Sequence, residues 1–152
     1  MARDHQRKCK DSKKTIEFVT VLTGSQQNPP VTTTGLGAGT LELSSDRRKL
    51  RFKFYFKNLT SPVQEPGPGV DYAHFHLAPA GSNGPVVHPL SQDIRLSVNR
   101  LSGEAKGVWS SKDEEPLTRE LVQALKRGDI YINIHTATYP NGEIRGQVVR
   151  LL

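Results

Sequence analysis

The sequence predicts an all-β protein, an antiparallel β-sandwich or barrel of about eight short strands with one short helix near residues 114–127. Hydrophobic residues alternate with polar ones along most of the chain, and clusters of Gly, Pro, Asn and Ser separate the alternating runs. One stretch changes to helical spacing instead. Short antiparallel strands joined by turns, with a single helix, are typical of sandwiches and barrels.

The N-terminal segment is interpreted as a basic tail. MARDHQRKCKDSKK carries six Lys and Arg residues against Asp4 and Asp11, which accounts for +4 of the formal net charge of +6. It has no apolar run, so it predicts neither a signal peptide nor a transmembrane anchor. We expect disorder over residues 1–14 and one folded domain over residues 15–152. The single cysteine, Cys9, lies in the tail and excludes an internal disulfide.

The strands follow in order after the tail. LRFKFYFKNL, from residue 50, is the clearest case, because Leu50, Phe52, Phe54 and Phe56 share one face and charged or tyrosine side chains take the other. Turn-rich segments such as TSPVQEPGPGVD and YPNG bound such runs. The predicted strands are residues 15–23, 39–43, 50–59, 72–78, 93–99, 103–109, 129–137 and 143–151.

The helix is predicted from EEPLTRELVQALKRGD. Its apolar residues recur at helical spacing, with two glutamates ahead of the first turn and two basic residues in the last. Gly128 follows as a stop signal. The segment therefore predicts a helix within about residues 114–127.

The charge distribution argues against a nucleic-acid-binding protein. Beyond the tail the chain carries only about +2, and its second basic cluster, from Arg47 to Lys57, straddles a predicted strand. Such a cluster is more often a solvated face or an edge guard than a phosphate track. No recognised nucleic-acid-binding motif accompanies it, so we expect no nucleic acid partner.

The histidines are the strongest chemical signal. His74 and His76 are two positions apart in YAHFHLA, so in a strand both imidazoles project from one face. In YINIHTA, His135 shares a face with Tyr131 and Asn133, opposite a run of isoleucines. Three histidines from two strands would suit Zn²⁺ or Cu²⁺, since imidazole binds both ions and a fourth position can stay open.

His88 or water is the expected fourth ligand, because the loop over residues 78–90 returns toward the end of the same strand. The alternative is that these histidines hydrogen-bond backbone and turn hydroxyl groups in a polar crevice and lock that loop. The sequence alone leaves both interpretations open.

The last hairpin carries a second charged feature. Asn141-Gly142 is a hairpin signal that brings residues 129–137 against residues 143–151. Glu143 and Arg145 then share a face near the start of the strand. They predict an ion pair, or an arginine that bonds backbone and pins the hairpin, ahead of a role in guiding an anion to a metal.

Four of these segments together resemble the CHRD domain, a repeat first described in chordin and common as a bacterial stand-alone domain. They are FVTVLTGSQQNPPVTTTGLGAGTLEL, AHFHLAPAGSNGPVV, LTRELVQALKRGD and IYINIHTATYPNGEIRGQVV, and they cover about residues 16–151 in family order. The resemblance implies a fold like copper/zinc superoxide dismutase, with His-x-His and the later His-Thr as hallmarks, and an extracellular or cell-surface location. The chain departs from the family pattern at Gln27, where an acid is expected, at His88, and in its missing secretion signal.

Two functions follow as hypotheses. The first is a binding or structural β-module for an unknown protein or surface ligand. The histidine cluster of this module is either a stabilising metal site or a polar knot, in which the histidines hydrogen-bond backbone and hydroxyl groups. The second is a small copper- or zinc-dependent redox enzyme of the superoxide dismutase type, suggested by fold analogy and the histidines. A binuclear site would need more ligands than His74, His76, His88 and His135 supply, so the binding module is favoured. No catalytic triad or phosphate loop is apparent in the sequence.

Overall fold

The computed structural model describes residues 14–64 and 67–152. The predicted tail lies outside the described residues except for Lys14. The strands are β1 (Ile16–Thr23), β2 (Leu36–Leu43), β3 (Lys49–Lys57), β4 (Ala73–Leu77), β5 (Val86–Pro89), β6 (Ile94–Leu96), β7 (Gly103–Ser110), β8 (Ile130–Ile134), β9 (Ile144–Gln147) and β10 (Val149–Arg150). The helix α2 spans Arg119–Arg127, and two 3₁₀ turns, η1 and η2, span Gly24–Gln26 and Ser91–Asp93.

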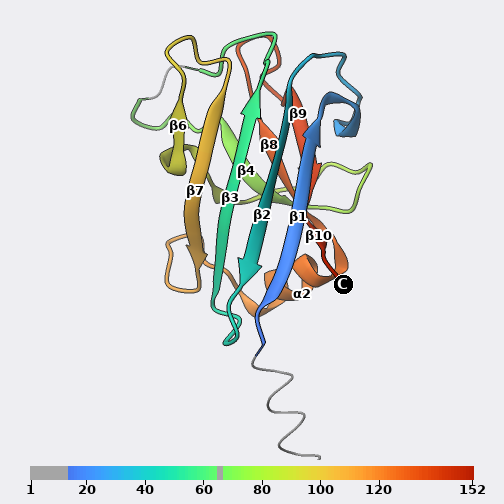
Figure 1. Ribbon diagram of the computed structural model, residues 1–152, viewed down its shortest axis with the longest axis vertical. Coiled ribbons are helices and arrows are strands. Elements are labelled where there is room, and N and C mark those ends of the chain that lie inside the picture. The colour runs from blue at the N-terminus through green and yellow to red at the C-terminus, as the bar shows by residue number, and fades with distance from the viewer. Residues whose placement is uncertain (1–13, 65–66) are drawn as a thin grey trace, which may run out of the picture.

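The strands form one antiparallel sheet that curls into a half-barrel (Figure 1). Its order is β5-β4-β8-β9-β1-β2-β3-β7-β6, with β10 pairing to β1 beside β9. The all-β prediction is confirmed. The described residues contain ten strands rather than about eight, because β5 lies in a segment that was predicted as a loop and the last predicted strand divides at the buried Val148 into β9 and β10.

The core lies inside the curl of the sheet. The alternation predicted for β3 is confirmed, since Leu50, Phe52, Phe54 and Phe56 are buried and the residues between them are exposed. Strand β2 approaches β3 too closely for a side chain at Gly39, where a Cβ atom would lie 2.3 Å from the Phe54 Cβ. The close approach accounts for glycine at this position. The sequence predicted strand over residues 39–43 only, but the run pairs with β1 and β3 from Leu36 onward.

Phe75 and Trp109 join the two ends of the curled sheet. Phe75 on β4 stacks on Trp109 of β7, with ring centroids 5.0 Å apart, and meets Phe52 edge to face at 5.5 Å. Aromatic pairs in such arrangements add about 0.5–1.5 kcal/mol each to the energy of burial. This contact fixes β4, the strand that carries His74 and His76, against the opposite part of the sheet.

Helix α2 begins at Arg119, later than the predicted start near 114. Thr118 is the N-cap, and its side chain accepts a hydrogen bond from the Leu121 N–H at 3.2 Å. The helix ends as predicted, at Gly128, whose φ of 84° is the left-handed conformation that glycine adopts freely. Among the described residues, no helix has the length and apolarity to cross a membrane.

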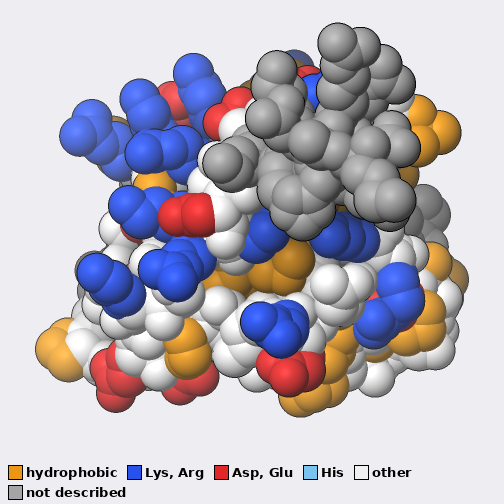
Figure 2. Space-filling view, turned by 90° about the horizontal axis from the view of Figure 1, so that it is seen from below, with side chains coloured by type: hydrophobic (Ala, Val, Ile, Leu, Met, Phe, Trp, Pro, Cys, Tyr) orange, Lys and Arg blue, Asp and Glu red, His pale blue; other side chains and the backbone are white. Residues whose placement is uncertain are grey.

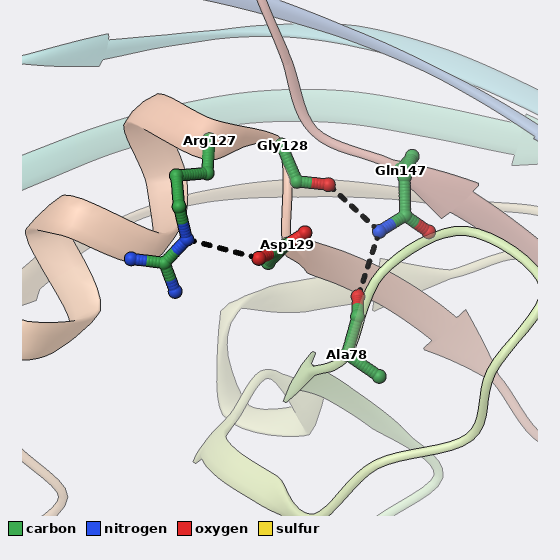
Figure 3. Close-up of polar contacts among 5 residues, drawn as sticks. All are labelled: Ala78, Arg127, Gly128, Asp129 and Gln147. Atoms are coloured by element: carbon green, nitrogen blue, oxygen red, sulfur yellow. Dashed lines mark hydrogen bonds and ion pairs between the residues drawn. The ribbon is translucent and has the colours of Figure 1, made fainter.

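Gln147 ties the end of the helix to the end of β4 (Figure 3). Its Nε2 donates to the carbonyls of Ala78 and Gly128, both at 2.9 Å. Beside it, Arg127 forms an ion pair with Asp129 at 3.0 Å. The loop after β4 is therefore anchored at its first residue.

The second basic cluster lies on a solvated face rather than guarding a sheet edge, which is one of the two alternatives expected from the sequence. Lys49, Arg51, Lys53 and Lys57 take the exposed face of β3, and β3 lies between β2 and β7 rather than at an edge. Seen from the end of the molecule in Figure 2, many of the Lys and Arg side chains gather toward one side of the view, beside carboxylates.

Candidate metal centre

The register of β4 against β8 places the histidines on one face of the sheet. His74 pairs with Asn133 and His76 pairs with Tyr131, and side chains directly opposite in an antiparallel pair point to the same side. His135 follows β8 immediately, and its N–H donates to the Tyr72 carbonyl at 2.7 Å. Two adjacent strands thus present all three imidazoles on the face opposite the aromatic core.

The three rings converge. One ligand atom of each of His74, His76 and His135 lies within 4.8 Å of the ligand atoms of the other two. Ring centroids are 5.0 Å apart for His74 and His135, 5.4 Å for His74 and His76, and 6.4 Å for His76 and His135. The predicted meeting of these three side chains is therefore confirmed.

Each ring has one nitrogen that is buried without a hydrogen-bond partner. These atoms are Nδ1 of His74, Nε2 of His76 and Nε2 of His135. A buried polar atom left unpaired costs about 1–3 kcal/mol. Three such atoms in one cluster are not what a satisfied polar knot would show, because there each nitrogen would bond to backbone or hydroxyl groups.

The opposite side of each ring is held by a hydrogen bond. His74 Nε2 lies 2.9 Å from Oδ2 of Asp71, His76 Nδ1 lies 2.9 Å from the Gly84 carbonyl, and His135 bonds the backbone of Pro140. A carbonyl only accepts, so the proton of neutral His76 is on Nδ1 and its Nε2 carries the free lone pair. Partners of this kind orient the histidine ligands of metal sites.

Burial keeps two of the rings uncharged. Desolvation, reinforced by His74 and His76, lowers the pKa of His135 to about 4. Desolvation also lowers the pKa of His76, and the hydrogen bond to Gly84 only partly opposes it. Burial acts to raise the pKa of Asp71, but hydrogen bonds with His74 and Ser91 outweigh it and hold that pKa below its usual value. Neutral imidazoles beside an ionised carboxylate form a site that favours a cation.

A stack of rings supports His76 from behind. His76 lies parallel to Tyr131 at 4.7 Å, and Cζ of Arg145 lies 3.5 Å from the centroid of the Tyr131 ring. The Tyr131 hydroxyl accepts from the Gly84 N–H at 3.1 Å, so Gly84 is bonded through both its backbone groups. The loop over residues 78–85 is thereby fixed against the cluster.

Glu143 and Arg145 do not form the ion pair that the sequence offered as one interpretation. Arg145 is buried and donates to the Pro79 carbonyl at 3.2 Å and to Oδ1 of Asn83 at 3.3 Å. It is thus the backbone-bonding arginine of the alternative interpretation. Glu143 accepts instead from Thr33, Thr136 and the Thr60 N–H, and it ties three loops together.

The structure does not place His88 with the other three histidines. His88 lies on β5 opposite Phe75 of β4, so it shares the face of Phe75 and points to the core side of the sheet. Its ring lies 5.1 Å from Trp109, and its Nδ1 lies 3.0 Å from the Glu115 carbonyl. The sequence assigned His88 as a fourth ligand because neither β5 nor its pairing to β4 was predicted.

Two residues of the site were missed from the sequence. Asp71 lies just before β4, and the signal for it was a carboxylate three residues ahead of a predicted ligand. Gly84 lies in the loop expected over residues 78–90 and was not singled out as a site residue, although a Cβ there would lie 1.8 Å from the Leu77 carbonyl oxygen. Its role comes from its backbone N–H and carbonyl groups, so its residue type did not indicate that role.

Comparison with protein families matches residues 18–148 of the chain to the CHRD domain. Neither the curated proteins nor the solved structures that were compared give a match, so the expected likeness to copper/zinc superoxide dismutase stays a prediction. The match includes both strands that carry the histidine cluster, β4 and β8. The chain therefore belongs to the CHRD domain family.

Proposed function

We propose that this domain is a metal-binding β-module in which His74, His76 and His135 hold one Zn²⁺ or Cu²⁺ ion. The observation that carries the proposal is the set of three unpartnered, buried imidazole nitrogens within 4.8 Å of one another. Metal–nitrogen bonds of about 2.0–2.1 Å require ligand atoms no more than about 4.2 Å apart. A small side-chain adjustment brings the three atoms to that separation.

The donor set favours zinc or copper over harder cations. Three neutral imidazoles and no carboxylate ligand suit Zn²⁺ and Cu²⁺, whereas Mg²⁺ and Ca²⁺ prefer oxygen. The lowered pKa values of His76 and His135 mean that little proton release opposes binding near neutral pH. Asp71, bonded to His74, adds a negative charge close to the ion without being a ligand.

A binding or structural role is the leading function for this site. The ligands lie on two paired strands and a loop fixed by hydrogen bonds, which is the rigid support that a stabilising ion or a docking point needs. A partner could coordinate the ion at its remaining position.

A small redox enzyme is the second candidate, and one observation favours it. Three protein ligands leave a coordination position open, which is typical of catalytic rather than structural zinc sites and of reactive copper sites. Against a binuclear dismutase stand the ligand count and the single cysteine of the sequence. Superoxide consumption by the copper-loaded protein separates the two candidates, because a binding module gives no rate above that of the His135→Ala variant.

Metal uptake tests the proposal directly. Protein purified without a histidine tag is dialysed against EDTA and titrated with ZnCl₂ and CuCl₂ in a calorimeter, and the bound metal is then counted by elemental analysis. We expect one ion per chain for the wild type and none for His135→Ala. His5→Ala is the matched control and should bind like the wild type. Uptake by His135→Ala equal to that of the wild type, or none by the wild type, would refute the site.

A further inference from the structure

A second feature lies on the other side of β4, at the open edge of the half-barrel. A hollow of about 730 Å³ lies between the segment before β4, the end of β5, η2 and the segment that follows β7. Its size falls in the range of small-molecule sites, about 300–1,000 Å³. Among the described residues, five carboxylates and no Lys or Arg line it; the acidic residues are Asp71, Asp93, Asp113, Glu114 and Glu115. This concentration of negative charge contrasts with the net charge of +6 of the chain.

His88 gives the hollow a directed acceptor. The residue is 7% exposed and lines the hollow. Its Nδ1 lies 3.0 Å from the Glu115 carbonyl, which only accepts, so in the neutral ring the proton is on Nδ1 and Nε2 carries a lone pair. Nε2 makes no hydrogen bond with the described residues and is not sealed from solvent. The free lone pair of a nine-tenths buried side chain therefore opens into the hollow.

Asp93 supplies a carboxylate next to this acceptor. It makes no ion pair and no side-chain hydrogen bond with the described residues, and its carboxyl group packs against Gly107, where a Cβ would lie 2.7 Å away. Desolvation raises the pKa of Asp93, Asp113 acts in the same direction, and His88 acts against them. Among the described residues, His88 is the one neighbour that favours its charge, and no Lys or Arg pairs with it, so a bound cation would supply the missing ion pair.

The segment over residues 113–115, which forms one acidic side of the hollow, is held in place by hydrogen bonds to backbone groups. The Glu115 carbonyl also accepts from the Trp109 indole N–H at 2.9 Å, and Asp113 accepts from the Ser110 N–H at 2.7 Å. Residues 113–115 are thus fixed to β7 and to the core. The hollow is therefore bounded on this side by a fixed backbone.

We propose that this hollow binds an organic cation, an ammonium or guanidinium group, through His88 Nε2 and the carboxylates of Asp93 and its neighbours. His88 Nε2 and the ionised carboxylates of the hollow accept hydrogen bonds, so the complementary ligand is rich in N–H donors and positively charged. Among the described residues, only the His74, His76 and His135 group brings three metal-ligating side chains together, which argues against a metal ion here. The cation is either a free small molecule or a Lys or Arg side chain of a protein.

The test is calorimetric titration of the full chain with L-argininamide, which carries both cationic groups and no carboxylate. We expect saturable binding, and at least tenfold weaker binding of citrullinamide, its analogue with a neutral urea group in place of guanidinium. Asp93→Asn, nearly isosteric, should weaken argininamide binding by about tenfold, since a hydrogen bond to a charged group is lost. Glu42→Gln, which removes one exposed carboxylate on β2 outside the hollow, is the matched control and should bind like the wild type.

Two further measurements identify the source of the cation and test whether this site is independent of the metal centre. A blocked pentapeptide with a central arginine that binds tenfold tighter than argininamide identifies a protein side chain as the source, and equal affinity identifies a free cation. His135→Ala should leave argininamide binding unchanged, so this site stands even if no metal binds. Equal binding of citrullinamide, unchanged binding by Asp93→Asn, or saturable Ca²⁺ binding with none of argininamide would overturn the proposal.

Discussion

Acidification should destabilise the metal-free protein through His135 in particular. The pKa of this side chain is about 4 in the folded protein and about 6.5 for a free imidazole in the unfolded chain. The unfolded state therefore takes up the proton first as the pH falls. Stability contributed by neutral His135 is complete above pH 6.5 and is lost progressively down to about pH 4.

The size of the effect follows from that difference. At 1.36 kcal/mol per pKa unit, the full difference is worth about 3.4 kcal/mol, and about 2.6 kcal/mol of it is expressed at pH 4.5. His135 is only partly buried, so solvent screening reduces the expected loss to about 2 kcal/mol. This loss is large against the total stability of a small domain, about 5–15 kcal/mol.

The assay compares urea unfolding at pH 7 and pH 4.5 for three EDTA-treated proteins. The free energy of unfolding should fall about 2 kcal/mol further between the two pH values in the wild type than in His135→Gln, because glutamine does not titrate. Carboxylates such as Asp71 also lose stabilising contacts in acid, but they do so in both proteins and cancel in the comparison. His5→Gln should match the wild type. Identical pH dependence of His135→Gln and the wild type would refute the reasoning.

Three further predictions concern residues around the metal centre. Asp71→Asn should weaken metal binding about 10- to 100-fold by calorimetry, since it weakens the support of His74; unchanged affinity would show that Asp71 has no such role. Gly84→Ala should lower the free energy of unfolding in urea by about 3 kcal/mol, because its Cβ meets a backbone oxygen, and a wild-type value would contradict the packing. Glu143→Gln should cost about 1–3 kcal/mol in the same assay by leaving one of three donors unpaired; no loss would mean that the loops adjust.

Period-two patterns allowed most of this fold and the three-histidine cluster to be predicted from sequence. A strand fixes which side chains share a face, so His74 and His76 had to point together, and the isoleucines of β8 assigned the opposite face to the core. The pairing of β4 with β8 then brought His135 to them. None of this required knowledge of the loops.

The errors arose where the local pattern was too short or involved backbone atoms. Strand β5 has four residues and ends in Pro89, too few for an alternation to be recognised, so the face of His88 was not predictable. The helix start was placed too early because Glu114 and Glu115 resemble a charged first turn. In the structure the Glu115 carbonyl is instead bonded by Trp109, nearby in the chain, and by His88, which is distant in sequence.

The position of the metal ligands along the chain has a consequence for how the domain acquires its ion. His76 and His135 are separated by most of the second half of the sequence, including β5 to β7 and helix α2. Bringing together two residues so far apart in the sequence costs chain entropy. Binding of an ion by two imidazoles alone does not compensate for this cost. During synthesis the His-x-His pair emerges well before His135, so the full ligand set exists only after β8 has paired with β4. Binding of the ion by all three histidines would then occur only in the completely folded domain. An ion bound earlier would be held by two ligands and would exchange readily.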